Sequence, residues 1–222
     1  MTTKVKICGL KTEAALEAAL AGGADYVGFV FYPPSPRNIT VEAAADLARR
    51  IVGRADVVAL LVDPDDGLLD AVWTALAPDI FQLHGSESPD RVAEIRRKFG
   101  TRVMKAIRVG SREDAETALS YAGIADLILF DAKVDESRAG ALPGGNGTLF
   151  DWTAIDKVKT RVSYILSGGL NPDNVSAAIE ATGAVAVDVS SGVEIRPGEK
   201  DVNLIARFIA IAKSAPATRI VS

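Results

Sequence analysis

The chain has 222 residues, of which 48% are hydrophobic, 24% charged and 6% aromatic, a composition typical of a soluble globular protein. Its formal net charge of −4 and pI of about 5.2 argue against nucleic acid or an anionic membrane as the main partner. A single cysteine excludes an intrachain disulfide, and no apolar run resembles a secretory signal or a membrane span, so we expect a cytoplasmic protein.

Short apolar runs alternate along the chain with alanine-rich, charge-dotted stretches. We predict strands at 4–9, 26–31, 55–62, 79–83, 102–109, 125–130, 162–167 and 184–190. We predict helices at 13–21, 41–51, 68–76, 90–98, 112–119, after Phe150, at 172–179 and at 202–212. The strand runs are β-branched and do not alternate, which is typical of parallel strands buried on both faces. Eight strand–helix units in succession predict an α/β fold, a single (β/α)8 TIM barrel formed by residues 1–222.

A doubly wound open sheet is the main alternative fold. A dinucleotide-binding version is disfavoured because no G-x-G-x-x-G motif follows the first strand. The one long irregular stretch, 131–147, is rich in glycine and charge, and loops of this length are usually functional or disordered. We expect the tail after Lys213 to be frayed.

Candidate functional residues gather at the predicted carboxyl ends of the strands, where barrel enzymes have their active sites. The only cysteine and the only histidine of the chain are among them. In chain order these strand ends provide Cys8, Arg37, Gln82 with His84, Arg108, Asp131, Gly168 with Gly169, and Asp188 with Ser190, Ser191 and Gly192.

Each of these residues also has a purely structural interpretation. Cys8 suits a small buried hydrophobe, His84 a satisfied structural group, and Asp131 a loop cap or a partner of Lys133. No grouping of His, Cys, Asp and Glu has the spacing of metal ligands, so we expect no metal.

The glycine-rich turns after the last two strands are more specific. SGGLNP begins at Ser167 and DVSSGVE at Asp188. Barrels often bind phosphate with the loops after strands seven and eight, although such glycines also serve simply to make tight turns. GGNG at 144–147, including Gly145, suits either a flexible flap or a further ligand contact.

A series of short motifs runs along the chain: KICGL, GFVFYPPSPR, FQLHG, FDAKV, GGNG followed by FDW, SGGLNPDNV, DVSSGVE and PGEKD. Together these motifs resemble those of the phosphoribosylanthranilate isomerases. They run in order from residue 4 to about residue 212, and their joint occurrence is far more specific than any one of them.

The resemblance implies a role for individual residues. It makes Cys8 the general base and Asp131 the general acid of an Amadori rearrangement that opens a ribose ring and yields a ketose. It makes Arg37 the residue that holds the anthranilate carboxylate, and Gln82 with His84 part of the substrate lining. The glycines of the last two loops become the phosphate cradle.

The implied chemistry requires one acid and one base, without a cofactor or metal. Asp131 must carry a proton when it acts, and Cys8 must act as a thiolate. Either a nearby cation such as Lys6 or a helix dipole would lower the pKa of the thiol. Because side chains alternate along a strand, we expect Lys6 to point to the same side as Cys8.

Three other functions stay open at this stage. An indole-glycerol-phosphate synthase would need a lysine-centred acid site, and a pentose-phosphate epimerase would need metal ligands with more than one histidine. A phosphate-binding barrel without catalysis is the non-enzyme alternative, and the presence of both Cys8 and Asp131 argues against it. We expect a small phosphorylated substrate as the partner, no nucleic acid and no membrane, and a monomer or a homodimer.

Overall fold

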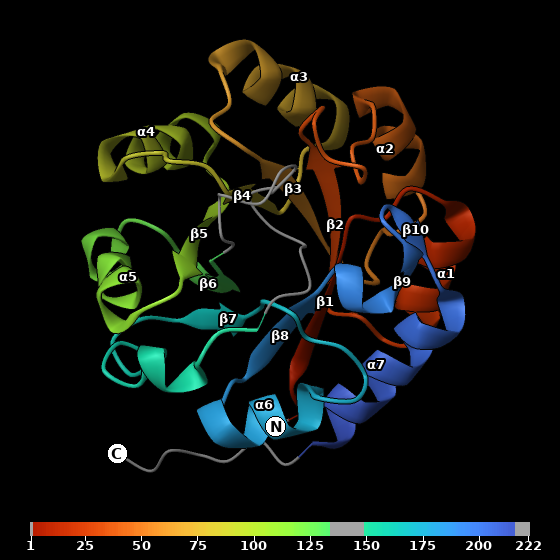
Figure 1. The fold of residues 1–222 in the computed structure, drawn as a ribbon. Coiled ribbons are helices and arrows are strands. Elements are labelled where there is room, and N and C mark those ends of the chain that lie inside the picture. The colour runs from red at the N-terminus through yellow and green to blue at the C-terminus, as the bar shows by residue number, and fades with distance from the viewer. Residues whose placement is uncertain (1, 134–148, 216–222) are drawn as a thin grey trace.

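The computed structural model describes residues 2–133 and 149–215, and eight parallel strands form a closed barrel in it (Figure 1). The strands neighbour one another in chain order, and the ring closes where the last strand pairs with the first. Their bounds are β1 Lys4–Cys8, β2 Tyr26–Phe31, β3 Asp56–Leu61, β4 Ile80–Leu83, β5 Arg102–Val109, β6 Leu127–Ala132, β7 Tyr164–Leu166 and β8 Ala186–Val189. The predicted (β/α)8 fold is confirmed.

Helices surround the barrel on the outside (Figure 1). The α-helices are α1 Glu13–Ala21, α2 Val41–Ala48, α3 Asp66–Leu76, α4 Pro89–Phe99, α5 Arg112–Glu116, α6 Val175–Thr182 and α7 Val202–Ser214. Short 3₁₀ helices are η1 Thr117–Tyr121, η2 Trp152–Ile155 and η3 Ser191–Val193. No helix in the described ranges is both long and apolar enough to cross a bilayer.

Side-chain caps explain where many of these helices begin. Thr12, Thr40, Asp65, Ser88 and Ser111 each accept a hydrogen bond from a backbone N–H of the first turn that follows. A hydroxyl or carboxylate at this position satisfies an N–H group that has no partner within the helix. Helix starts are therefore fixed locally by the sequence.

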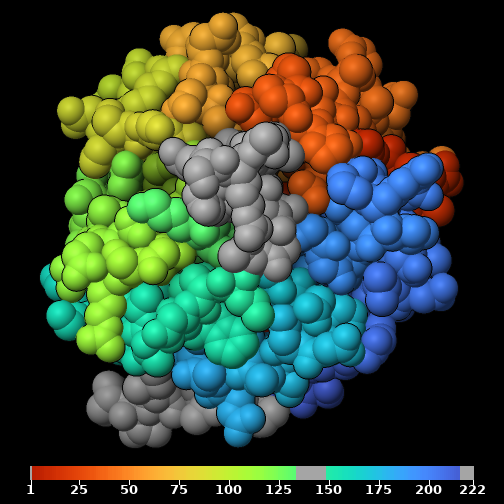
Figure 2. Space-filling model, viewed as in Figure 1, coloured from red at the N-terminus to blue at the C-terminus, as the bar shows by residue number. Residues whose placement is uncertain are grey.

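Two apolar layers stabilise the fold. The barrel interior is filled by side chains from seven of its strands, among them Tyr26, Val58, Met104 and Leu129. A larger layer packs the outer faces of the strands against the helices. The first and last helices, α1 and α7, pack against each other, and the beginning and end of the described chain adjoin on one side of the molecule (Figure 2).

Several observed elements differ from the predicted ones, among them α6, which is predicted at 172–179 and observed at Val175–Thr182. β6 runs to Ala132, so Asp131 lies within the strand and not after it. The helix expected at 112–119 is α-helical only to Glu116 and continues as η1. The prediction of a helix after Phe150 is wrong, because only the single-turn η2 forms there. The helix expected at 41–51 ends at Ala48.

A two-stranded antiparallel ribbon after β8 was not predicted. It consists of β9 Glu194–Arg196 and β10 Glu199–Lys200, joined by a turn that contains Gly198. Its strands are too short for a periodic pattern to reveal them.

Candidate active site

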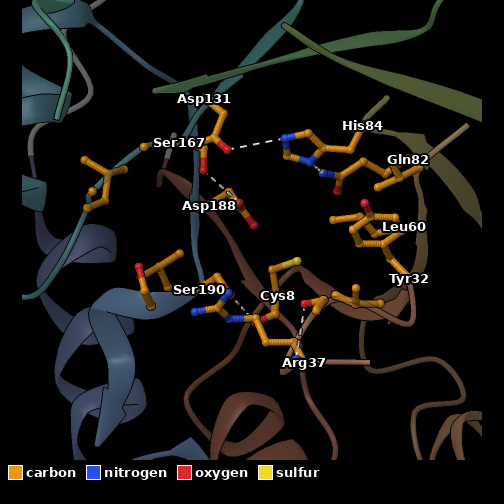
Figure 3. Close-up of a pocket in the computed structure, with 18 residues that line it drawn as sticks. Cys8, Tyr32, Arg37, Leu60, Gln82, His84, Asp131, Ser167, Asp188 and Ser190 are labelled. Carbon is orange, nitrogen blue, oxygen red and sulfur yellow. Dashed lines mark hydrogen bonds and ion pairs between the residues drawn. The ribbon is translucent and has the colours of Figure 1, made fainter. Parts of the chain in front are cut away.

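One pocket opens at the carboxyl ends of the barrel strands and collects most of the candidate residues (Figure 3). Its wall is formed by residues of six strands, β1, β2, β3, β4, β6 and β8, and by loops at the carboxyl ends of strands, among them the loop after β7. Of the candidate residues, the lining includes Cys8, Arg37, Gln82, His84, Asp131, Gly168, Gly169, Asp188, Ser190 and Ser191.

Cys8 ends β1, and its thiol faces the cavity from the side opposite Asp131 and His84 (Figure 3). It packs with Val30 and Leu60 in a small apolar cluster. Burial raises the pKa of the Cys8 thiol above its ordinary value, although Lys6 pulls it in the opposite direction. The resting side chain is therefore mainly a neutral thiol near pH 7, and the expected lowering effect of Lys6 is outweighed by burial.

Lys6 lies beneath the pocket and not in its lining. Its ammonium group is fully buried and donates to Asp188 across 2.8 Å. The Ser167 hydroxyl donates to the other Asp188 oxygen across 2.9 Å. Burial opposes the charge on Lys6, yet Asp188 and Cys8 raise its pKa above the ordinary value, which favours the charged form of Lys6.

Lys6 and Cys8 point to the same side of β1, as the alternation predicts. A Cβ at Gly28 of the neighbouring strand would lie 3.2 Å from the Cys8 sulfur and 3.4 Å from the Lys6 nitrogen. Glycine at this position leaves space for both side chains.

Asp131 and His84 point toward one another from β6 and from the loop after β4 (Figure 3). The Asp131 Oδ2 and His84 Nε2 atoms are 3.3 Å apart. Gln82 Nε2 lies 3.2 Å from His84 Nδ1, and which of the two atoms carries the shared proton depends on the tautomer of the imidazole ring. Asp131 Oδ1 accepts from the Ala132 backbone N–H across 3.0 Å. Lys133 instead pairs with Asp114 on the surface.

The loops after β7 and β8 approach each other very closely. A Cβ at Gly192 would lie 1.9 Å from the Leu170 carbonyl oxygen, and one at Gly168 would lie 2.5 Å from the Ala132 nitrogen. Gly168 also has φ of +86°, which favours glycine. Gly168, Gly169 and Ser191 of these loops line the pocket.

Arg37 is buried and extends beside Cys8 toward Ser190 (Figure 3). Its Nε donates to Glu194 Oε1 across 2.8 Å and its Nη2 to Oε2 across 2.7 Å. Lys200 binds the same carboxylate across 2.8 Å and donates to the Ser190 carbonyl across 2.9 Å. Burial opposes the charge on Glu194, but the hydrogen bonds from Arg37 and Lys200 hold its pKa below the ordinary value.

Some candidate residues lie away from the pocket wall. Lys6 is under the floor, and Gly192 contacts the loop after β7. Arg108, on β5, is opposite Asp131 in the register with β6 and donates to the His84 carbonyl at 3.4 Å. Gly145 lies outside the described residues.

The pocket also contains residues that the sequence analysis did not single out. Its polar additions are Ser35 and Ser167, and an apolar wall is formed by Val30, Tyr32, Leu60 and Val62. Glu194 lies within the DVSSGVE motif and Lys200 within PGEKD. The motifs included both residues, but the sequence assigned neither of them a function.

Among residues 2–133 and 149–215, no group of three or more His, Cys, Asp and Glu side chains has the arrangement of a metal site.

A family model and two relatives that match this chain carry the same name. The family model described as N-(5'phosphoribosyl)anthranilate (PRA) isomerase matches residues 5–211. A Parvibaculum lavamentivorans protein named N-(5'-phosphoribosyl)anthranilate isomerase is 53% identical over 215 residues, covering 97% of this chain and 100% of its own length. A Brucella melitensis protein of the same name is 48% identical, with 99% of each chain covered.

Solved structures give the same result. Phosphoribosyl anthranilate isomerase from Thermotoga maritima superposes with a TM-score of 0.82 at 38% identity, covering 95% of this chain and 98% of that one. Another phosphoribosyl anthranilate isomerase structure, at 35% identity and a TM-score of 0.82 with the same coverage, holds reduced 1-(o-carboxyphenylamino)-1-deoxyribulose 5-phosphate.

Proposed function

Since the chain belongs to the N-(5'-phosphoribosyl)anthranilate isomerase family of tryptophan biosynthesis, we propose that Cys8 is its general base and Asp131 its general acid. The chain is an enzyme, an intramolecular aldose–ketose isomerase. The observation that supports the two assignments is that both side chains line one pocket, from β1 and from β6. A thiol and a carboxyl group on two sides of one cavity suit the transfer of protons at two atoms of one sugar.

The substrate would lie across the barrel mouth with its three parts in different surroundings. The apolar wall of Val30, Tyr32, Leu60 and Val62 suits the aromatic ring. The backbone of the loops that contain Gly169 and Ser191 suits the phosphate, because oriented N–H groups bind anions. The ribose then lies between Cys8 and Asp131.

The first chemical step would open the sugar. Asp131 gives its proton to the furanose ring oxygen, the bond from this oxygen to C1 breaks, and the nitrogen lone pair forms a C1=N double bond. His84, whose Nε2 faces Asp131, would stabilise the carboxylate that remains.

The second step would remove the proton from C2. The Cys8 thiolate accepts this proton, and the electron pair of the C–H bond moves toward the C1=N bond to give an enolamine, which tautomerises to the ketone. The thiolate is the minor form in the resting enzyme. The positively charged Schiff base favours it at the moment when it is needed, because a nearby cation lowers the pKa of a thiol.

Arg37, from the loop after β2, would bind the anthranilate carboxylate. Its guanidinium group is planar and can bind a carboxylate through two parallel hydrogen bonds. Gln82 would act through His84, whose ring it orients by the contact at Nδ1.

We further propose that residues 1–222 form one domain, and that the enzyme acts in the cytoplasm on a small phosphorylated substrate. The acidic net charge of −4 supports a small-molecule partner over nucleic acid or membrane.

The decisive experiment is Asp131→Asn, which keeps the shape of the side chain and removes the transferable proton. We expect kcat to fall by about 10²–10⁴-fold, the usual contribution of a general acid, while substrate binding persists. The assay follows the loss of fluorescence of phosphoribosylanthranilate that is generated in situ.

The matched control is Asp70→Asn, which alters an exposed carboxyl paired with Lys98 on the outer surface. Its kcat should equal that of the unaltered enzyme. Nearly full activity of Asp131→Asn would show that the acid is another group, with Asp188 the next candidate.

A further inference from the structure

Three buried charged side chains form a cluster beside the pocket. Arg37, Glu194 and Lys200 have side chains that are only 6%, 4% and 2% exposed. Glu194 binds Arg37 through both carboxylate oxygens and shares one of them with Lys200. Charged groups are rarely buried to this degree unless their position matters or their partners are ideal.

The contact with Glu194 fixes the plane of the guanidinium group. Glu194 occupies the edge formed by Nε and Nη2, so the donors on the side away from it are those of the Nη1–Nη2 edge. The stem is held as well, since a Cβ at Gly9 would lie 3.0–3.2 Å from three carbon atoms of Arg37. The side chain therefore cannot rotate about its stem without breaking the bidentate contact.

The ribbon of β9 and β10 packs closely against the loop that contains Arg37. Gly198 has φ of +83°, and a Cβ there would lie 2.3 Å from the Pro36 carbonyl oxygen. Lys11 donates to the same oxygen across 2.7 Å. The ribbon that carries Glu194 thus packs against the residue that precedes Arg37.

We propose that Glu194 is a positioning residue for substrate recognition, which orients Arg37 so that the guanidinium group meets the substrate carboxylate edge-on. This inference rests on the proposed role of Arg37. A group held in its binding orientation before the ligand arrives loses less entropy on binding, and the benefit appears as affinity. Lys200 has a different task, because it ties Glu194 to the Ser190 carbonyl of the loop after β8.

The test compares two substrates, N-(5'-phosphoribosyl)anthranilate and its aniline counterpart, which lacks only the carboxylate. The quantity measured is the ratio of their kcat/KM values. In Glu194→Gln we expect kcat/KM for the anthranilate substrate to fall by about 10- to 100-fold, mainly through KM, as for the loss of a hydrogen bond to a charged group. The aniline substrate should change by less than about 3-fold, because it never uses the oriented arginine.

Lys213→Met is the matched control, because it removes a partly buried lysine–carboxylate pair, with Asp25, that does not contact Arg37 or Glu194. It should leave both kcat/KM values and their ratio unchanged. Arg37→Lys should reduce the ratio in the same direction as Glu194→Gln, and the Arg37→Lys/Glu194→Gln double variant should lower it no further than Arg37→Lys alone.

The remaining outcomes distinguish the carboxylate-binding role of Arg37 from the positioning role of Glu194. Equal losses for both substrates in Glu194→Gln, with a reduced ratio in Arg37→Lys, would overturn the positioning role while Arg37 keeps its own. An unchanged ratio in Arg37→Lys would overturn the proposed carboxylate site and this inference with it. If Glu194→Gln does not fold, Glu194→Asp keeps the charge but is one methylene too short for both contacts, and the same change in ratio is expected.

Discussion

Replacing Lys6 by Met tests the buried ion pair under the active site. Methionine has a similar length but no charge, so Asp188 would keep only the hydrogen bond from Ser167. Removing one partner of a buried pair usually costs about 3–5 kcal/mol, and because that hydrogen bond remains we expect about 3 kcal/mol. For a chain of this length such a loss lowers Tm by about 6–12 °C.

The free energy of unfolding is measured by urea titration of the purified enzyme, with thermal unfolding as the second readout. The double variant Lys6→Met/Asp188→Asn removes both charges and leaves an amide to accept from Ser167. We expect it to recover most of the loss, because replacing both members of a buried pair is often close to neutral. This difference separates an uncompensated charge from poor packing of methionine.

The same substitution has a kinetic consequence through Cys8. Burial raises the pKa of the thiol and Lys6 lowers it, so removing the lysine raises that pKa further. The thiolate then forms at higher pH, and the rising limb of kcat/KM against pH should move to higher pH in Lys6→Met. A free energy of unfolding of Lys6→Met within about 1 kcal/mol of that of the unaltered enzyme would refute the stability argument, because the expected loss is larger. An unmoved rising limb would refute the link between Lys6 and Cys8.

Two further substitutions test the machinery around the pair. Cys8→Ser keeps the shape but offers a far weaker acid, so kcat should fall by about 10²–10⁴-fold with little change in Tm; a normal kcat would remove Cys8 from the mechanism. Gly168→Ala places a Cβ 2.5 Å from the Ala132 nitrogen and shifts the end of β6, so Asp131 moves and kcat should fall by about 100-fold in steady-state assays. Gly53→Ala is its control, because φ is also positive at +73° but no atom lies within 4 Å, so kcat should be unchanged; similar kcat values in the two variants would contradict the argument.

Much of the local structure was predictable because its causes are local. The helix predicted at 13–21 is the observed α1, which begins after the capping Thr12 and ends at Ala21, before Gly22. The strand predicted at 102–109 is the observed β5, which lies between Thr101 and Gly110 and is rich in apolar residues. Capping groups and short apolar-rich segments act over a few residues, so they can be recognised without the rest of the fold.

The errors arose where distant contacts determine the local structure. Asp131 lies within β6 because the strand continues its pairing with β5 as far as Ala132 and Val109. The segment after Phe150 forms only η2, although a full helix was expected there. Neither fact can be read from the propensity of a few residues.

The sequence by itself determined the barrel, the order of its elements and the strand ends where polar residues gather. The tertiary structure decided which of those residues interact. Lys6 and Asp188 are 182 positions apart and become partners because the ring closes with β1 and β8 in that register. Arg37 and Glu194, 157 positions apart, meet through the ribbon after β8. Periodicity and capping act over one or two turns, whereas the pairing of buried charges depends on barrel closure, which no short segment contains.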